Sequence, residues 1–283
     1  MDYDEYLANL IAENRFGAGD RLGTANLIDA SARLRAVGAV HTGECLSLAR
    51  PLVDEDLGAD VHAFVLEVSV GEGPIGFTMD RVELSCHGMS NTHLDALNHM
   101  AIDGMFYGSR EMGDPQLSSI AELAAHGLVT RGVVVDVPSI RGQEWVTPED
   151  PVTGDDIDRA LGSTTFERGD ALLLYMGRDR FEAAGSPTGA LRPGVGRSGA
   201  EWMADNGVSI VCWDFIDVID GPQPGLYVHR LIRAIGLLLV DNCDLAGAAG
   251  LARDRGVQTG ALVVSPIAIP GGTGCHVTPL LML

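Results

Sequence analysis

The residues best suited to chemistry are three histidines and one aspartate that lie close together in the chain. They are His87, His93, Asp95 and His99. His93 and Asp95 are two residues apart, which places both side chains on one face of an extended segment. Asp95 and His99 are four residues apart, which places them on one face of a helix. A change from strand to helix near Thr92, which with Asp95 resembles a capping box, brings these side chains to one point.

Two imidazoles and a carboxylate form a ligand set that suits Zn²⁺ or Mn²⁺. A bound metal ion lowers the pKa of its water from about 15.7 to about 7, which makes hydroxide available at neutral pH. A further histidine that does not bind the metal could then carry protons, because its pKa lies near the working pH. One isolated histidine is more often a core or surface residue. The prediction of a metal site therefore rests on the clustering.

Other polar residues give weaker signals. His229 and Asp241 flank an apolar segment, and on their own they suit a helix start and a loop or cap position. Asp214, Asp217 and Asp220 recur at helical spacing and predict a solvated edge rather than metal ligands. The remaining histidines have no acidic partner at ligand spacing and are predicted to be structural: His41, His62, His126 and His276.

Composition excludes several classes of function. The 283 residues carry a formal net charge of −20, which disfavours binding to nucleic acid or to an anionic membrane. No apolar run reaches about 18 residues, and the N-terminus is acidic where a signal peptide is basic. The five cysteines include no C-x-x-C pair, so we expect reduced thiols in a cytoplasmic protein. No G-x-S-x-G elbow is present, which disfavours a covalent hydrolase, although a triad assembled in space stays open.

Hydrophobic patterning predicts strands that alternate with helices, which is typical of an α/β fold. Gly71–Gly76 formally matches the dinucleotide motif G-x-G-x-x-G, but a strand pattern follows it, so it predicts a hairpin turn. The expected strands span 62–70, 75–86, 132–137, 171–175, 208–213 and 260–269. The expected helices span 2–14, 29–37, 154–161, 197–206 and 228–235.

The segment Asn91–His99 resembles the G-T-H-x-D-A-P-x-H signature of the metal-dependent cyclase family. That family includes bacterial kynurenine formamidase and isatin hydrolase. Four further segments resemble its W-G-x-x-D-x-x-G-x-x-N, G-D-hydrophobic, H…E-N-x-x-L and G-G-T-G motifs. They are Phe16–Asn26, Gly169–Leu174, His229–Leu245 and Gly271–Gly274.

The resemblance implies a role for each matching residue. His93 and Asp95 match metal ligands, and His99 matches the catalytic acid and base. His229 matches a ligand of a second metal ion, and Asp241 stands where the family usually has a glutamate ligand. The implied cofactor is one or two ions of Zn or Mn.

Two positions depart from the family pattern. Met89 occupies the position of the family's first histidine, four residues before His93. His87 lies six residues before His93, and a two-residue bulge could deliver it to the metal. We therefore predict His87 as a ligand, as in a subgroup with the pattern H-G-x-x-x-T-H-x-D-A-L-x-H. Asp241 is one methylene shorter than glutamate, which leaves the second metal ion open.

The resemblance further implies a swivelling β/β/α fold with a mixed sheet, as one domain over 1–283 with an N-terminal helical arm about 1–38. It implies a homodimer or homotetramer that hydrolyses a C–N bond of a small cyclic or aromatic amide, lactam or formamide. Phe106, Tyr107 and Trp213 are the aromatic residues nearest the motifs and are candidates for lining the substrate pocket. The alternatives on the same fold are a pathway-specific cyclase or dehydratase and a metal-poor small-molecule binding protein.

Overall fold

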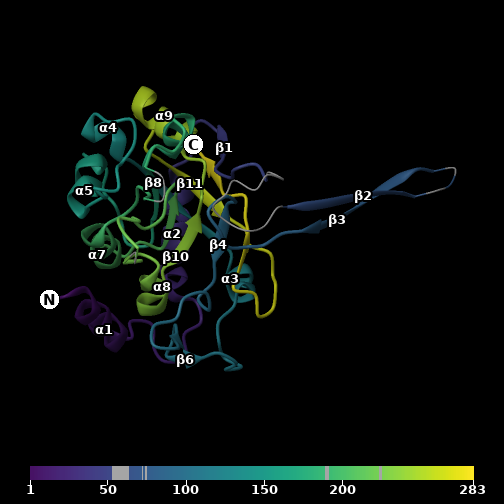
Figure 1. Cartoon of the computed structure of the whole chain (residues 1–283), viewed down its shortest axis with the longest axis horizontal. Coiled ribbons are helices and arrows are strands. Elements are labelled where there is room, and N and C mark those ends of the chain that lie inside the picture. Colours follow the sequence, from purple (N-terminus) through teal and green to yellow (C-terminus); the bar gives the residue numbers. More distant parts are fainter. Residues whose placement is uncertain (53–63, 72, 74, 189–190, 223–224) are drawn as a thin grey trace.

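A mixed sheet of nine strands forms the centre of the molecule (Figure 1). The computed structural model describes residues 1–283 except 53–63, 72, 74, 189–190 and 223–224. In spatial order the strands of this main sheet are β1 (Cys45–Ser47), β13 (Leu280–Met282), β11 (Thr259–Val264), β7 (Leu128–Asp136), β8 (Ala171–Tyr175), β9 (Ile210–Trp213), β10 (Leu238–Asp241), β4 (His93–Asp95) and β12 (Gly274–His276).

The four middle strands, β7 to β10, run parallel to one another. Every residue of β8, β9 and β10 is buried. Strands covered on both faces lose the alternation of polar and apolar residues, and this explains the continuous apolar runs in the sequence. The strands predicted at 132–137, 171–175 and 208–213 are therefore confirmed. Antiparallel strands flank this parallel group, with β11 beside β7 and β4 beside β10.

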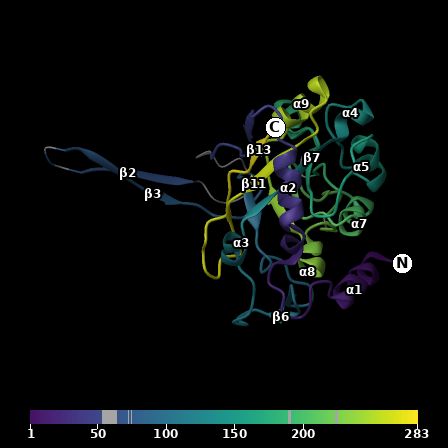
Figure 2. The same ribbon diagram turned by 180° about the vertical axis from the view of Figure 1, so that it is seen from behind.

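Helices cover the main sheet and confirm the predicted α/β class. Helix α2 crosses the sheet over β7 and β11 (Figure 2), whereas α4, α5, α7 and α8 lie together along another side (Figure 1). In the described part of the chain, no helix is long and apolar enough to cross a membrane. The helices are α1 (Tyr3–Glu13), the 3₁₀ helix η1 (Gly23–Leu27), α2 (Ala30–Gly38), α3 (Ile120–His126), α4 (Val137–Arg141), α5 (Gly154–Leu161), α6 (Arg178–Ala183), α7 (Arg197–Asp205), α8 (Arg230–Ile235) and α9 (Ala246–Arg255).

A two-stranded hairpin extends away from the main sheet (Figures 1 and 2). It consists of β2 (Val65–Gly71) and β3 (Phe77–Glu83), paired in antiparallel register. The segment Gly71–Gly76 thus joins two strands, and a strand rather than a helix follows it, as predicted. A second, short hairpin pairs β5 (Met105–Phe106) with β6 (Arg110–Glu111).

The helix predicted to begin near Thr92 is absent, and this prediction is wrong. The segment instead forms β4 and then a turn in which the His99 N–H donates to the Ala96 carbonyl. The Ala96 N–H donates to Thr273, and the Thr92 hydroxyl donates to the Asn242 carbonyl instead of capping a helix. Long-range bonds to neighbouring strands therefore replace the local helical bonds.

The strand predicted over 260–269 is shorter than expected. It ends as β11 at Val264, two residues before Pro266. Proline has no N–H for a sheet and restricts the residue before it, which explains the end of the strand. Further along the chain, strand β12 pairs with β4 and helps to build the site described below.

Helix α5 provides a test of the fold through the buried carboxylate of Asp156. Burial alone would raise the pKa of Asp156, but hydrogen bonds from Arg141 and Thr153 lower it to about 2. A carboxyl group that is more acidic in the folded than in the unfolded state stabilises the fold above its unfolded pKa of about 3.9. This contribution disappears as the pH falls toward 2.

We expect Asp156→Asn to lower the free energy of unfolding at pH 7 by about 1–3 kcal/mol, the usual range for a hydrogen bond to a charged group. The difference from the wild-type protein shrinks as the pH falls below about 4. Urea unfolding at several pH values measures both effects. Asp155→Asn is the matched control, because Asp155 is exposed on the same helix turn. A pH-independent loss of stability would contradict the assignment to the carboxylate charge.

Candidate metal centre

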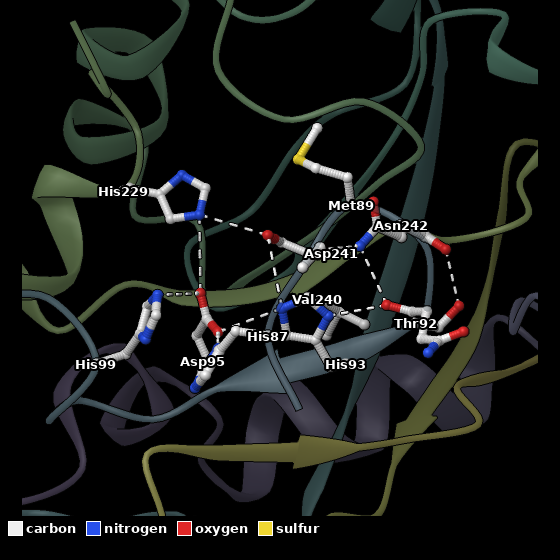
Figure 3. A network of polar contacts seen from close by, with 12 residues as sticks. His87, Met89, Thr92, His93, Asp95, His99, His229, Val240, Asp241 and Asn242 are labelled. Atoms are coloured by element: carbon white, nitrogen blue, oxygen red, sulfur yellow. Dashed lines mark hydrogen bonds and ion pairs between the residues drawn. The ribbon is translucent and has the colours of Figure 1, made fainter. Parts of the chain in front are cut away.

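Strand β4 places its histidine and aspartate at the centre of a polar cluster (Figure 3). β4 lies between β10 and β12, and Asp241 on β10 stands opposite His93 in the antiparallel register. Directly opposed residues of an antiparallel pair share a face of the sheet, so the two side chains meet. We call the following residues the His/Asp cluster: His87, His93, Asp95, His99, His229 and Asp241.

The carboxylate of Asp95 is the common member of the cluster. Its side chain is 0% exposed. Oδ1 lies 2.9 Å from His87 Nδ1 and 3.6 Å from His93 Nε2. Oδ2 lies 3.8 Å from Nε2 of both His99 and His229. Among the described residues, no group donates a hydrogen bond to Oδ2. A buried carboxylate oxygen without a donor is costly, and a metal ion is the partner that this donor set fits.

Two groups of three residues each bring their ligand atoms within 4.8 Å of one another, and Asp95 belongs to both. The first group is His87, Asp95 and His99, and the second group is His93, Asp95 and Asp241. His229 Nε2 approaches the second group, 3.4 Å from Asp241 Oδ2. Ligands about 2.1 Å from a tetrahedral metal ion are about 3.4 Å apart, so these separations suit a metal site. The sequence prediction paired His87 with His93, and the structure divides them between the groups.

Two hydrogen bonds orient the imidazoles of His93 and His229. His93 Nδ1 lies 2.8 Å from the Asn91 carbonyl, and His229 Nδ1 lies 2.6 Å from Asp217 Oδ2. Both partners are acceptors, so each Nδ1 carries the proton in the neutral ring. The lone pair is then on Nε2, which faces Asp241 in both residues. Such contacts to the other ring nitrogen are the usual support of histidine ligands.

Trp213 supports Asp241 rather than lining an open pocket. The Trp213 side chain is fully buried, and its indole N–H donates to Asp241 Oδ1 over 2.6 Å. This leaves Asp241 Oδ2 facing the histidines. Burial alone would raise the pKa of Asp241, but His229, His93 and the indole lower it to about 2. Burial alone would lower the pKa of His229, but Asp241 and Asp217 raise it well above its usual value, so a metal ion that binds at Nε2 would displace a proton. Asp241 is therefore an anionic donor.

The predicted solvated edge at Asp214, Asp217 and Asp220 is wrong for its first two members. Asp214 is 2% exposed, and its carboxylate accepts backbone N–H bonds from the turn into α6, at residues 176–178, and from Phe215. Burial raises its pKa to about 6, against these backbone donors. Asp217 is fully buried and orients His229, and only Asp220 is exposed. The chain after β9 is not helical, so helical spacing misplaced these side chains.

Asn242, drawn in Figure 3, and Arg178 hold the segment that delivers His87. The Asn242 amide donates to the Gly88 carbonyl over 2.8 Å and to the Asn91 carbonyl over 3.1 Å. Arg178 is buried, donates to Asn242 Oδ1 over 2.6 Å and also donates to the Met89 carbonyl. Met89 thus contributes its backbone to this support. Neither Asn242 nor Arg178 was predicted, and the only sequence signal was the position of Asn242 beside Asp241.

The cluster is open to solvent on the side of His87 and His99. Their side chains are 30% and 24% exposed, and their rings stack with centroids 3.9 Å apart. Burial lowers the pKa of His99, and Asp95 opposes that shift. His99 is therefore neutral at pH 7 and can accept a proton.

Burial raises the pKa of Cys86, the residue before His87, to about 12, so its thiol is protonated and does not act as a nucleophile.

The other two aromatic residues predicted to line the substrate pocket are Tyr107 and Phe106, and both are buried. The Tyr107 hydroxyl donates to Asp20 over 2.8 Å, and its ring lies against Gly236. Phe106 is buried within the short β5–β6 hairpin.

The four histidines predicted to be structural have different surroundings. His41 is exposed, and His126 Nε2 contacts Arg33 over 3.2 Å. His276 stands opposite His93 on β12, and its Nε2 is buried without a partner among the described residues. His62 lies outside the described residues.

Comparisons with known proteins agree with the predicted fold. A structure described as a novel cyclase superposes with a TM-score of 0.85 at 22% identity, over 98% of this chain and 99% of that one. Isatin hydrolase A from Labrenzia aggregata, bound to benzyl benzoate, gives 0.59 at 18% identity, over 88% and 96%. A predicted metal-dependent hydrolase from Bacillus stearothermophilus gives 0.54 at 19% identity, over 84% and 97%. No curated protein matches the chain.

These structural similarities confirm the predicted cyclase-type mixed α/β fold. A model of the Cyclase family matches residues 28–218, about two thirds of the sequence. The chain belongs to the Cyclase family.

Proposed function

We propose that this protein is a metal-dependent hydrolase that cleaves a C–N bond of a small cyclic or aromatic amide, lactam or formamide. The observation that carries the proposal is the buried Asp95 carboxylate, whose Oδ2 has no donor among the described residues and faces histidine nitrogens. Family membership and the structural similarity to isatin hydrolases support it.

The residues that would hold the metal fall into two sites that share Asp95. His93, Asp241 and His229 complete one site, and His87 completes the other, with His99 beside it. A bound Zn²⁺ or Mn²⁺ would supply a Lewis acid for the carbonyl oxygen and lower the pKa of water. The metal stoichiometry of the purified protein would distinguish one bound ion from two.

His99 is the residue proposed to move protons. It is neutral at pH 7, partly exposed and 3.8 Å from Asp95 Oδ2. It would take a proton from the attacking water and return it to the leaving nitrogen. His87 stacks against the His99 ring and limits its rotation. The exposed edges of these two rings define the side from which a substrate approaches.

Metal content tests the site directly. We expect protein purified without chelator to contain stoichiometric Zn or Mn, and His93→Ala to lose it. Trp213→Phe keeps the packing but removes the N–H that orients Asp241, so metal affinity falls about 10- to 100-fold. Elemental analysis and competition with a chelator measure both effects. His41→Ala, at an exposed histidine, is the control and should keep the metal. If the wild-type protein purified without chelator is folded but contains no metal, the proposal is contradicted.

Loss of the His99 imidazole tests its role in catalysis. We expect His99→Gln to lower kcat about 10²- to 10⁴-fold against a panel of formanilides, lactams and isatin, with metal content unchanged. A fall in metal content would instead make His99 a ligand of the site with His87. Mass spectrometry of the products separates hydrolysis, which adds one water in total, from cyclisation or dehydration. Products of unchanged or lower mass would replace hydrolysis with the cyclase or dehydratase activity.

The protein is also proposed to be a homodimer or homotetramer. Leu66, Val68 and Val70 share one face of the extended hairpin and are 49%, 58% and 72% exposed. A free two-stranded hairpin has little stability of its own, so a partner chain is expected to cover this face. Sedimentation is expected to give a multiple of the 29.8 kDa chain mass, and Val68→Asp to lower it. Leu34→Asp, at an exposed leucine of α2, is the control, and a monomeric wild-type protein contradicts this proposal.

A further inference from the structure

A second cavity lies between helix α1, the loop that follows it, residues 107–109 and helix α8. Its volume is about 280 Å³, and none of the His/Asp cluster residues lines it. Helices α1 and α8 pack against each other in the lower part of Figure 1. The cavity is therefore separate from the proposed hydrolase site, and the following inference does not depend on that function.

The cavity contains a buried guanidinium without a matching anion. Arg233 is 6% exposed and lines the cavity. One of its terminal nitrogens donates to the Ser109 hydroxyl over 3.2 Å, and Nε has no hydrogen-bond partner among the described residues. No described carboxylate lies within 4.0 Å of this guanidinium. Burying an unpaired charge is unfavourable, so an anion is the missing partner.

The other polar residues of the cavity do not neutralise Arg233. Arg15 adds a second guanidinium, which pairs over 3.6 Å with Glu13, a side chain that is 54% exposed. Asp20 is the carboxylate bonded to Tyr107, and it already accepts bonds from its own loop. No aspartate or glutamate is among the lining residues, although the chain carries 39 of them. The cavity thus presents positive charge in a protein of net charge −20.

We propose that this cavity binds a small organic carboxylate with an apolar body. A guanidinium matches a planar carboxylate through paired N–H donors, and this suits Arg233 better than an isolated point charge. Leu10, Ile11 and Phe16 add apolar surface to the lining of the cavity. Ligand pockets usually measure about 300–1,000 Å³, so the volume limits the ligand to a small molecule.

Calorimetric titration of the full-length protein, as purified, with benzoate tests this site. We expect saturable binding of one benzoate per chain and at least tenfold weaker binding of benzamide, which has the same shape without the charge. Arg233→Met weakens benzoate binding at least tenfold. Ala12→Trp fills the cavity from its exposed side with both guanidiniums retained, and it produces the same loss.

Two control variants separate this cavity from other sites. Arg180→Met removes an exposed arginine of α6, and His93→Ala disables the metal centre, and both keep benzoate binding. The proposal is overturned if the wild-type protein does not bind benzoate at millimolar concentration, or if Arg233→Met and Ala12→Trp bind it normally. Equal binding of benzamide or of inorganic phosphate also overturns the carboxylate assignment. Loss of binding in His93→Ala would place benzoate at the metal centre instead.

Discussion

The buried carboxylate of Asp95 is the constraint on which the site depends. It has no solvent contact, and it is surrounded by nitrogen atoms of four histidines from three separate segments. A carboxylate in such a place is tolerated only with strong partners. Strand β4 must therefore be held between β10 and β12, since a shift of one residue would turn Asp95 to the other face of the sheet.

The surrounding contacts fix the donors rather than add further ones. Asn91 and Asp217 set the protonated nitrogen of two imidazoles, and the Trp213 indole selects the Asp241 oxygen that faces them. The Asn242 amide holds the backbone segment that carries His87 through two hydrogen bonds. Trp213, Asp217 and Asn242 are fully buried, which restricts the conformations that they can adopt. The ligand geometry is thus prepared by packing, as a metal or a reacting group requires.

The sequence allowed prediction of what local patterns determine. The buried strands β7 to β9 and the common face of His93 and Asp95 could be predicted, because apolar runs and alternation depend only on neighbouring residues. The turn after β4 was not, since the Ala96 N–H bonds to Thr273, far along the chain. The burial of Asp217 was missed for a similar reason, because its partner His229 belongs to a different segment. Long-range pairing decides both positions.

Buried charge gives the same physical argument at two places in the fold. Most buried carboxylates of the described chain are satisfied internally, as Asp156 is by Arg141 and Asp214 by backbone N–H groups. Asp95 and Arg233 are different, because each keeps an atom without a hydrogen-bond partner and each borders a site where a ligand could be held. Their charges are opposite, so the partners they require are opposite. A cation at Asp95 and an anion at Arg233 resolve the two imbalances without any change in the fold.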